Sequence, residues 1–186
     1  QFSFPIKENN KLNTKNFYGL SKYINEITSK TFSDIYNIKV VGLRFFTVFG
    51  EWGRPDMLIF KYLKSNLENK KFYLNDNGEH FRDFTYIDDV IEVLIKLKNI
   101  KLRKKNQILN ICSNKPIGLI KIIKYLEKFS PKIKINKRKF QKSDVYKTHG
   151  DNKRILKFLK FKKFTNIYDA LKKTHDWFLR NKKIYK

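Results

Sequence analysis

The hydrophobic positions of the chain switch repeatedly between a helical spacing and a strand spacing. Residues 17–36 place apolar side chains every three or four positions, which predicts an amphipathic helix. Residues 38–46 read IKVVGLRFF, a β-branched and aromatic run that predicts a buried strand. The remaining predicted strands are 72–74, 81–87, 107–111 and 133–135, and the remaining predicted helices include 56–67, 88–97 and 116–129. Because strands and helices alternate, the pattern predicts an α/β layered fold.

Polar residues and turn formers mark the ends of these elements. Residues 1–16 read as a surface loop, 47–55 as a second loop and 75–78 as a turn. Four residues are expected to cap or begin helices: Asp56, Asp88, Asp151 and Thr165. Pro116 is expected in the first turn of its helix, where its missing N–H costs nothing.

Charge is the most unusual bulk property of the chain. It carries 42 Lys and Arg against 17 Asp and Glu, a formal net charge of +25. A basic protein suggests a nucleic-acid partner, but no recognition motif accompanies the charge here. Lysine, asparagine and isoleucine are all abundant, and their codons consist largely of A and T, so genome composition can explain the excess. We therefore expect a lysine-rich solvated surface, a mild preference for phosphate-bearing ligands and no nucleic-acid partner.

The single cysteine and the lengths of the apolar runs bear on where the protein works. Cys112 follows a predicted buried strand and cannot form an internal disulfide, which favours a reducing cytoplasm. The first residues do not resemble a signal peptide, and no apolar run is long enough to cross a bilayer. We expect a cytoplasmic protein with no membrane partner.

Tyr18 and Lys22 are the first residues that suggest chemistry. Four residues apart on a helix, they lie on one face, so the ammonium can favour the phenolate form of the tyrosine. Such a tyrosine can accept a proton from a hydroxyl group. The alternative is a chance pair on a helix surface, because the chain holds ten tyrosines and many lysines.

A turn that seats a dinucleotide pyrophosphate is missing from the sequence. The seven glycines do not fall in the strand–Gly-x-x-Gly-x-x-Gly–helix pattern. Gln1 is therefore expected to lie inside a longer protein whose N-terminal half holds that turn. The chain reads as a C-terminal fragment that is inactive by itself.

Residues 43–57 carry the most specific resemblance. The order Arg-Phe-Phe-Thr-Val-Phe-Gly, then Trp-Gly-Arg-Pro-Asp-Met, resembles extended short-chain dehydrogenases/reductases, in particular the UDP-glucuronate 4-epimerases of the NAD-dependent nucleotide-sugar epimerase family. The resemblance implies an α/β fold: the C-terminal portion of a Rossmann-like parallel sheet fold plus a small α/β nucleotide-sugar-binding domain. It implies that residues 1–50, with part of 80–112, are the remainder of the NAD-binding domain, and that 51–186 mainly bind substrate.

The resemblance also implies roles for single residues. Tyr18 and Lys22 would be catalytic and would also contact NAD, with a catalytic Ser or Thr lying upstream. Thr47 and Arg54 match a pair associated with the sugar carboxylate, which a guanidinium can grip through two parallel bonds. Loop packing is the alternative role of Arg54. Arg82, in the segment Arg-Asp-Phe-Thr-Tyr-Ile-Asp-Asp, matches an arginine implicated in binding the UDP diphosphate.

Two further positions match the family and one departs from it. Gln141 and Asp144 stand in a segment similar to Gln-Pro-Gly-Asp-Val, which places Asp144 near the nucleotide ribose. Glu51 replaces a proline that is usual in the family loop. This extra anion beside Arg54 either weakens carboxylate binding or faces solvent.

No metal site is expected. The three histidines are far apart in sequence and are expected at the surface: His80, His149 and His175. Asp83, Asp88 and Asp89 are oxygen ligands of the kind that hard cations prefer. We instead expect Asp83 to steady its loop and Asp88 to cap a helix.

The predicted function is NAD-dependent epimerisation at C4 of a UDP-sugar, with UDP-glucuronate converted to UDP-galacturonate through a 4-keto intermediate. The resemblance implies a homodimer in the full-length protein and a place in cell-surface polysaccharide synthesis. The first alternative is a related nucleotide-sugar dehydratase or decarboxylase. The second is a basic nucleic-acid-binding module.

Overall fold

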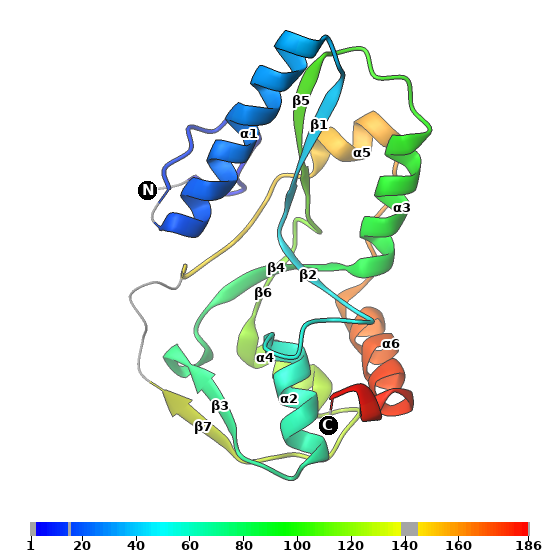
Figure 1. Cartoon of the computed structure of the whole chain (residues 1–186). Helices are drawn as coiled ribbons and strands as arrows, with labels where there is room; N and C mark the ends of the chain where they lie inside the picture. Colours follow the sequence, from blue (N-terminus) through cyan, green and yellow to red (C-terminus); the bar gives the residue numbers. More distant parts are fainter. Residues whose placement is uncertain (1–2, 15, 139–144, 186) are drawn as a thin grey trace.

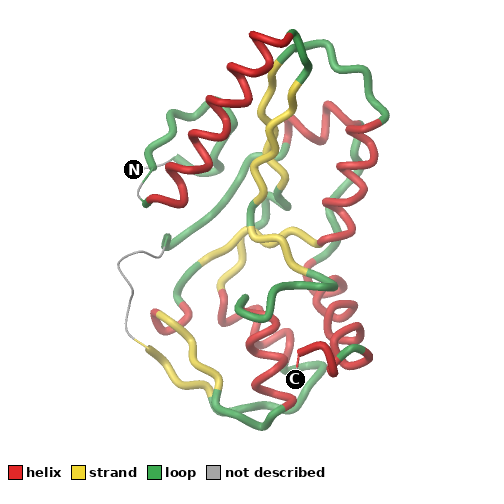
Figure 2. Tube along the Cα trace, viewed as in Figure 1, coloured by secondary structure: helices red, strands yellow, loops and turns green. Residues whose placement is uncertain are grey.

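The computed structural model describes residues 3–14, 16–138 and 145–185. Its helices are α1 (Phe17–Tyr36), α2 (Leu58–Leu67), α3 (Ile87–Lys98), α4 (Leu119–Leu126), α5 (Lys153–Leu159) and α6 (Ile167–Arg180), with short 3-10 turns η1 (Asp76–Gly78) and η2 (Lys182–Tyr185). Its strands are β1 (Val40–Phe45), β2 (Thr47–Phe49), β3 (Phe72–Asn75), β4 (Phe81–Tyr86), β5 (Asn106–Ile111), β6 (Pro116–Gly118) and β7 (Ile135–Arg138). Figures 1 and 2 show the two groups of elements that they form at opposite ends of an elongated molecule.

One end is built on the parallel pair β1 and β5, with Val40 opposite Asn106 and Phe45 opposite Ile111. In Figure 1, α1 lies to one side of this pair and α3 and α5 lie to the other. The apolar cluster of this end joins the pair to α3 and α5, and its buried members are Val90, Val93, Leu109, Ile111, Ile155, Leu159 and Phe161. β5 is mostly buried in this cluster, whereas β1 is only half-buried and ends at the exposed Phe45.

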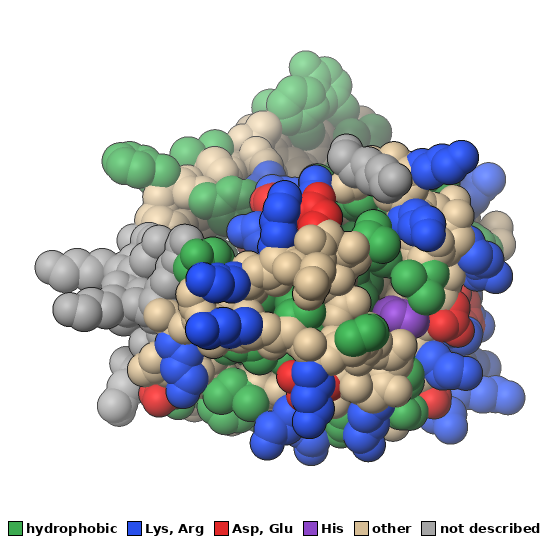
Figure 3. All heavy atoms as spheres, turned by 90° about the horizontal axis from the view of Figure 1, so that it is seen from below, with side chains coloured by type: hydrophobic (Ala, Val, Ile, Leu, Met, Phe, Trp, Pro, Cys, Tyr) green, Lys and Arg blue, Asp and Glu red, His purple; other side chains and the backbone are tan. Residues whose placement is uncertain are grey.

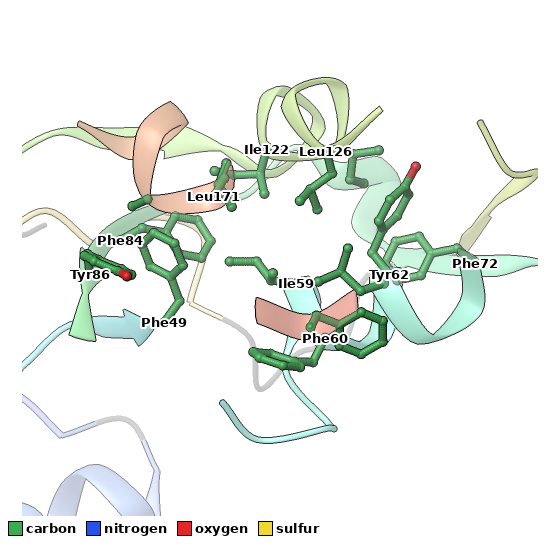
Figure 4. Packing of buried hydrophobic residues seen from close by; sticks show 14 of the residues in the cluster. Phe49, Ile59, Phe60, Tyr62, Phe72, Phe84, Tyr86, Ile122, Leu126 and Leu171 are labelled. Atoms are coloured by element: carbon green, nitrogen blue, oxygen red, sulfur yellow. The ribbon is translucent and has the colours of Figure 1, made fainter. Parts of the chain in front are cut away.

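The other end contains β3 paired in parallel with β7, together with α2, α4 and α6. Figure 4 shows its core, where Phe60 and Tyr62 of α2 lie among side chains from α4, α6 and the strands. Phe60 stacks on Tyr185, with ring centroids 4.8 Å apart. The aromatic content of this cluster stabilises it, because each large ring removes much apolar area from water.

A three-stranded sheet, in the order β2-β4-β6, connects the two ends. The chain bends at Phe46, whose N–H donates to Ile111 while its carbonyl accepts from Val48 at 2.9 Å. After the bend, Thr47 pairs in parallel with Phe84. The bend therefore transfers the chain from the β1/β5 pair to the sheet in the middle of the molecule.

The predicted α/β layers with parallel strands are confirmed, and the helix at 17–36 has the predicted bounds. Two predictions were wrong because strand pairing overrides local pattern. The predicted loop 47–55 begins as β2, and Pro116 lies in β6, antiparallel to β4, instead of in a helix. An edge strand tolerates proline because one of its sides makes no ladder bonds. The helix after it spans only 119–126.

Other boundaries moved by a few residues. The predicted strand 133–135 is observed as β7, two residues later. Met57 precedes α2 and Tyr86 precedes α3, so neither Asp56 nor Asp88 is the capping residue. Asp88 lies in the first turn of α3, where the positive end of the helix dipole still favours a carboxylate. The helices that were predicted to begin at Asp151 and Thr165 begin slightly later. The residue before α5 is Asn152, and the residue before α6 is Asn166.

The expectation that the histidines lie at the surface was wrong. His80 and His175 are buried, and His149 is half-buried. The ring of His175 packs on Phe129, and the His149 ring stacks near Phe4 while its Nε2 lies 2.7 Å from Asn114 Oδ1. Histidine has an apolar ring body, so packing against other rings hides it without a metal.

Asp83 steadies its surroundings, as the sequence predicted. Its side chain is fully buried, and it accepts hydrogen bonds from Ser113 N, Ser113 Oγ and Gly150 N at 3.0, 2.7 and 3.1 Å. Burial raises the pKa of Asp83, and these donors oppose that effect. The carboxylate thereby ties the end of β5 and the segment at Gly150 to β4, next to Arg82.

The charged side chains are dispersed over the end of the molecule that carries α2 and β3. Figure 3 shows Lys and Arg side chains scattered over the end that carries α2 and β3, with apolar and acidic groups between them. Among the residues that the structure describes, no helix has the length and apolar content needed to cross a bilayer.

Candidate functional site

The middle of the molecule contains a cavity of about 160 Å³. Three residues singled out from the sequence line it: Thr47 from β2, Arg54 from the loop after it, and Arg82 from β4. Its walls are mostly apolar and include Val48, Phe49, Met57, Leu58, Ile59, Phe60, Phe84 and Leu119. An apolar cavity with a few convergent polar groups is the usual form of a small-molecule site.

Tyr18 and Lys22 lie together on α1, as their spacing predicted. The Lys22 ammonium is 5.4 Å from the centre of the Tyr18 ring, and the Tyr18 side chain is largely exposed. Asn16 begins this helix, and its side chain accepts a hydrogen bond from Gly19 N at 2.8 Å. The cap fixes the first turn of α1, which is the turn that carries the tyrosine.

The loop between β2 and α2 is held from two sides. Tyr86 donates its hydroxyl hydrogen to the Glu51 carboxylate, with oxygens 2.8 and 2.9 Å away. Tyr185, near the C-terminus, donates to the Gly53 carbonyl at 2.8 Å. The loop needs such anchors because Trp52 has a positive φ of 59°, an uncommon conformation for a bulky residue. Glu51 is thus turned to Tyr86, which places its charge on a partner other than Arg54.

Arg54 forms a two-point ion pair with Asp56. Its Nε lies 3.0 Å from Asp56 Oδ1 and its Nη2 lies 2.6 Å from Oδ2. Hydrogen bonding to Asp56 and then its charge raise the pKa of Arg54, and a lesser contribution comes from the Tyr18 phenol. The pKa of Asp56 is lowered, first by the hydrogen bond from Arg54.

Arg82 lines the cavity from the neighbouring strand. Its Nη1 donates to the carbonyl oxygens of Phe81 and Tyr146 at 2.9 and 3.2 Å. These contacts hold the guanidinium beside the backbone of Phe81 and Tyr146. The predicted site residues Gln141 and Asp144 both lie outside the described residues.

The structure therefore brings together Thr47, Arg54 and Arg82 around one cavity, with Tyr18 and Lys22 on α1. Sequence reasoning missed the ion-pair partner of Arg54 and one of the anchors of the loop. Asp56 was assigned to the helix start, and Tyr185 is more than 130 positions from Gly53 along the chain. No local pattern marks such a long-range contact. The sequence does carry a signal for the pairing of Arg54 with Asp56, because the two opposite charges lie two residues apart across Pro55.

The donors at this site suit anionic oxygen groups better than a metal ion. Two guanidinium groups and a hydroxyl can bind carboxylate or phosphate oxygens. Among the described residues, no group of three or more His, Cys, Asp or Glu side chains is placed to hold a metal. The exposed Tyr18 phenol and the Lys22 ammonium can both hydrogen-bond hydroxyl groups such as those of a ribose.

Two curated proteins are similar to this chain over most of its length. The chain is 37% identical over 182 residues to an uncharacterized protein of Methanocaldococcus jannaschii, covering 96% of this chain and 55% of the relative. It is 33% identical over 186 residues to a UDP-glucuronate 4-epimerase of Thermodesulfobacterium geofontis, covering 98% and 56%. The chain thus spans little more than half the length of these relatives.

Solved structures share the fold. The UDP-glucuronic acid 4-epimerase from Bacillus cereus, in complex with UDP-glucuronic acid and NAD, is 27% identical and superposes with a TM-score of 0.88. The alignment covers 97% of this chain and 58% of that enzyme. This similarity confirms the predicted Rossmann-like architecture and the resemblance to NAD-dependent nucleotide-sugar epimerases. Residues 2–112, more than half of the chain, match the NAD dependent epimerase/dehydratase family, and the chain belongs to that family.

Proposed function

We propose that this chain carries the catalytic tyrosine and the sugar-nucleotide site of a UDP-glucuronate 4-epimerase, which forms UDP-galacturonate. One observation carries the proposal: Thr47, Arg54 and Arg82 line the same cavity. A UDP-uronate has two anionic parts, a carboxylate on the sugar and a diphosphate. A cavity with two separate guanidinium groups matches that distribution of charge.

Tyr18 acts as the acid and base. As the phenolate, Tyr18 accepts the proton of the sugar 4-hydroxyl, and the Lys22 ammonium lies 5.4 Å from the centre of its ring. NAD, when bound beside Tyr18 and Lys22, would supply the hydride acceptor and donor that oxidation at C4 and reduction of the 4-keto sugar require. Tyr18 then gives its proton back to the new hydroxyl. Tyr18 and Lys22 also contact the nicotinamide ribose in this proposal.

The remaining site residues bind different parts of the substrate. Arg54 and Thr47 bind the C6 carboxylate, and the guanidinium fork and hydroxyl together offer three donors. Arg82 binds the diphosphate. Gln141 and Asp144 are proposed at the nucleotide ribose.

We extend the proposal to the whole protein. The relatives are nearly twice as long as this chain, which supports a complete enzyme with a dinucleotide-binding half before Gln1. In it, residues 1–50 and part of 80–112 belong to the NAD-binding domain, and 51–186 mainly bind the sugar nucleotide. The proposed complete enzyme is a homodimer that works in the cytoplasm, without a nucleic-acid or membrane partner, in polysaccharide synthesis.

Substitution of Arg54 tests the substrate assignment. In the complete enzyme, Arg54→Ala should lower kcat/KM for UDP-glucuronate by roughly tenfold or more, because a charge-assisted two-point contact is lost. UDP-glucose has a C6 hydroxyl instead, so its kcat/KM should change far less. Arg54→Lys should restore only part of the activity, since an ammonium lacks the planar fork.

Three outcomes would contradict the assignment. A wild-type preference for the neutral sugar would exclude carboxylate recognition. Equal losses with both sugars would make Arg54 a loop anchor. A product that has lost water or carbon dioxide, identified by NMR, would favour the dehydratase or decarboxylase alternative.

A further inference from the structure

The pairing of Arg54 with Asp56 leaves part of the guanidinium unused. A guanidinium has five N–H donors, one on Nε and two on each terminal nitrogen. Asp56 takes the edge formed by Nε and Nη2. Among the described residues, no other group hydrogen-bonds this guanidinium, so both donors of Nη1 and one of Nη2 remain for a second anion.

The side chain of Arg54 lacks other support. Just before it in the loop, Tyr86 bonds the Glu51 side chain and Tyr185 bonds the Gly53 carbonyl. The arginine side chain itself is 75% exposed, so packing does not fix its rotamer. A flexible arginine must lose side-chain entropy each time it binds a ligand, and a fixed partner reduces that loss.

We propose that Asp56 is a positioning residue, which holds Arg54 with its second edge available to the cavity and so sharpens selection of a carboxylate-bearing sugar. This inference rests on the proposed function, in which Arg54 reads the sugar carboxylate. Pro55 favours the arrangement, because its ring fixes φ between the two charged residues. Asp56 contacts no substrate atom and acts through Arg54 alone.

Asp56→Asn in the complete enzyme tests the inference. It keeps the shape of the side chain but removes its charge, so KM for UDP-glucuronate should rise roughly two- to fivefold, the range expected when an exposed ion pair is lost. The kcat for this sugar, and both constants for UDP-glucose, should stay within error. In an Arg54→Ala background, Asp56→Asn should have no further effect, since the two residues act as one unit.

Glu68→Gln is the matched control. It removes the same charge from another exposed ion pair, with Lys70 at 2.9 Å, at the far end of α2. It should leave both sugars unaffected. A second readout is the NMR signal of the Arg54 Nε–H group, which should broaden or exchange faster in Asp56→Asn.

The possible results separate the inference from the proposed function. Tighter binding of UDP-glucuronate by Asp56→Asn would show that Asp56 competes with the substrate, and would overturn the inference. An unchanged KM, equal effects on both sugars, or the same effect without Arg54 would also overturn it, while the proposed function would stand. A wild-type enzyme without preference for the uronate would overturn both.

Discussion

At the scale of single residues, Tyr18 is the proposed acid and base. Its ring is exposed, and an ammonium lies 5.4 Å from its centre. Tyr18→Phe in the complete enzyme should lower kcat by about a hundredfold or more, the range for loss of a positioned acid/base group. Affinity for the UDP-sugar should change little, because the ring is kept.

Tyr23→Phe is the matched control for that experiment. Tyr23 lies on the same helix and is also exposed, but it has no proposed role. Turnover measured by NMR should be unaffected by this change. Normal turnover with Tyr18→Phe would remove Tyr18 from the mechanism.

At the scale of elements, the segment before α5 is packed closely on the end of β5. Asn110 Nδ2 donates to the Asp151 carbonyl at 3.2 Å, and Asn152 Nδ2 donates to the Cys112 carbonyl at 2.9 Å. Gly150 lies in the same contact. A Cβ atom there would meet the Phe46 ring, and would stand 2.6 Å from Cys112 Sγ.

Gly150→Ala should therefore destabilise the protein by about 1–3 kcal/mol, the usual cost of overpacking. Gly118→Ala is the control, because a Cβ at that position meets its nearest neighbour at an ordinary 3.5 Å. Urea unfolding of the two variants and the wild type measures the difference. Equal midpoints for the two variants would contradict the close contact.

At the scale of the whole molecule, α1 presents an unusual number of apolar side chains to solvent. The exposed ones are Phe17, Leu20, Ile24, Ile27, Phe32 and Ile35, and Ser33 is the residue of this helix that is buried. A contiguous apolar surface of this kind marks an interaction site. It supports the proposed homodimer, with α1 in the interface.

Sedimentation at several protein concentrations tests this proposal. The complete enzyme should self-associate, and Ile24→Lys with Ile27→Lys should shift it to the monomer, because a charge in an apolar interface is costly. The control is Ile95→Lys, which changes an exposed isoleucine of α3. A monomer at every concentration, or equal dissociation by the control, would contradict a dimer through α1.

The elements with strong periodicity could be predicted from the sequence. The helix 17–36 and the strands at β1 and β5 follow from spacing, because a local pattern decides which face of an element is buried. The closeness of Tyr18 and Lys22 followed in the same way, since an interval of four residues is fixed by the helix itself. The family resemblance rested on contiguous motifs, which are also local.

Only the tertiary structure decided what depends on contacts between distant segments. Thr47, Arg54 and Arg82 share one cavity because β2 pairs with β4. The sequence of neither short strand indicates which strand it pairs with. Strand pairing likewise placed Pro116 in β6, where the local sequence predicted the start of a helix. The physical reason is that spacing along the chain determines only which neighbours share a face, whereas burial and pairing depend on segments whose separation in sequence carries no information about their distance in space.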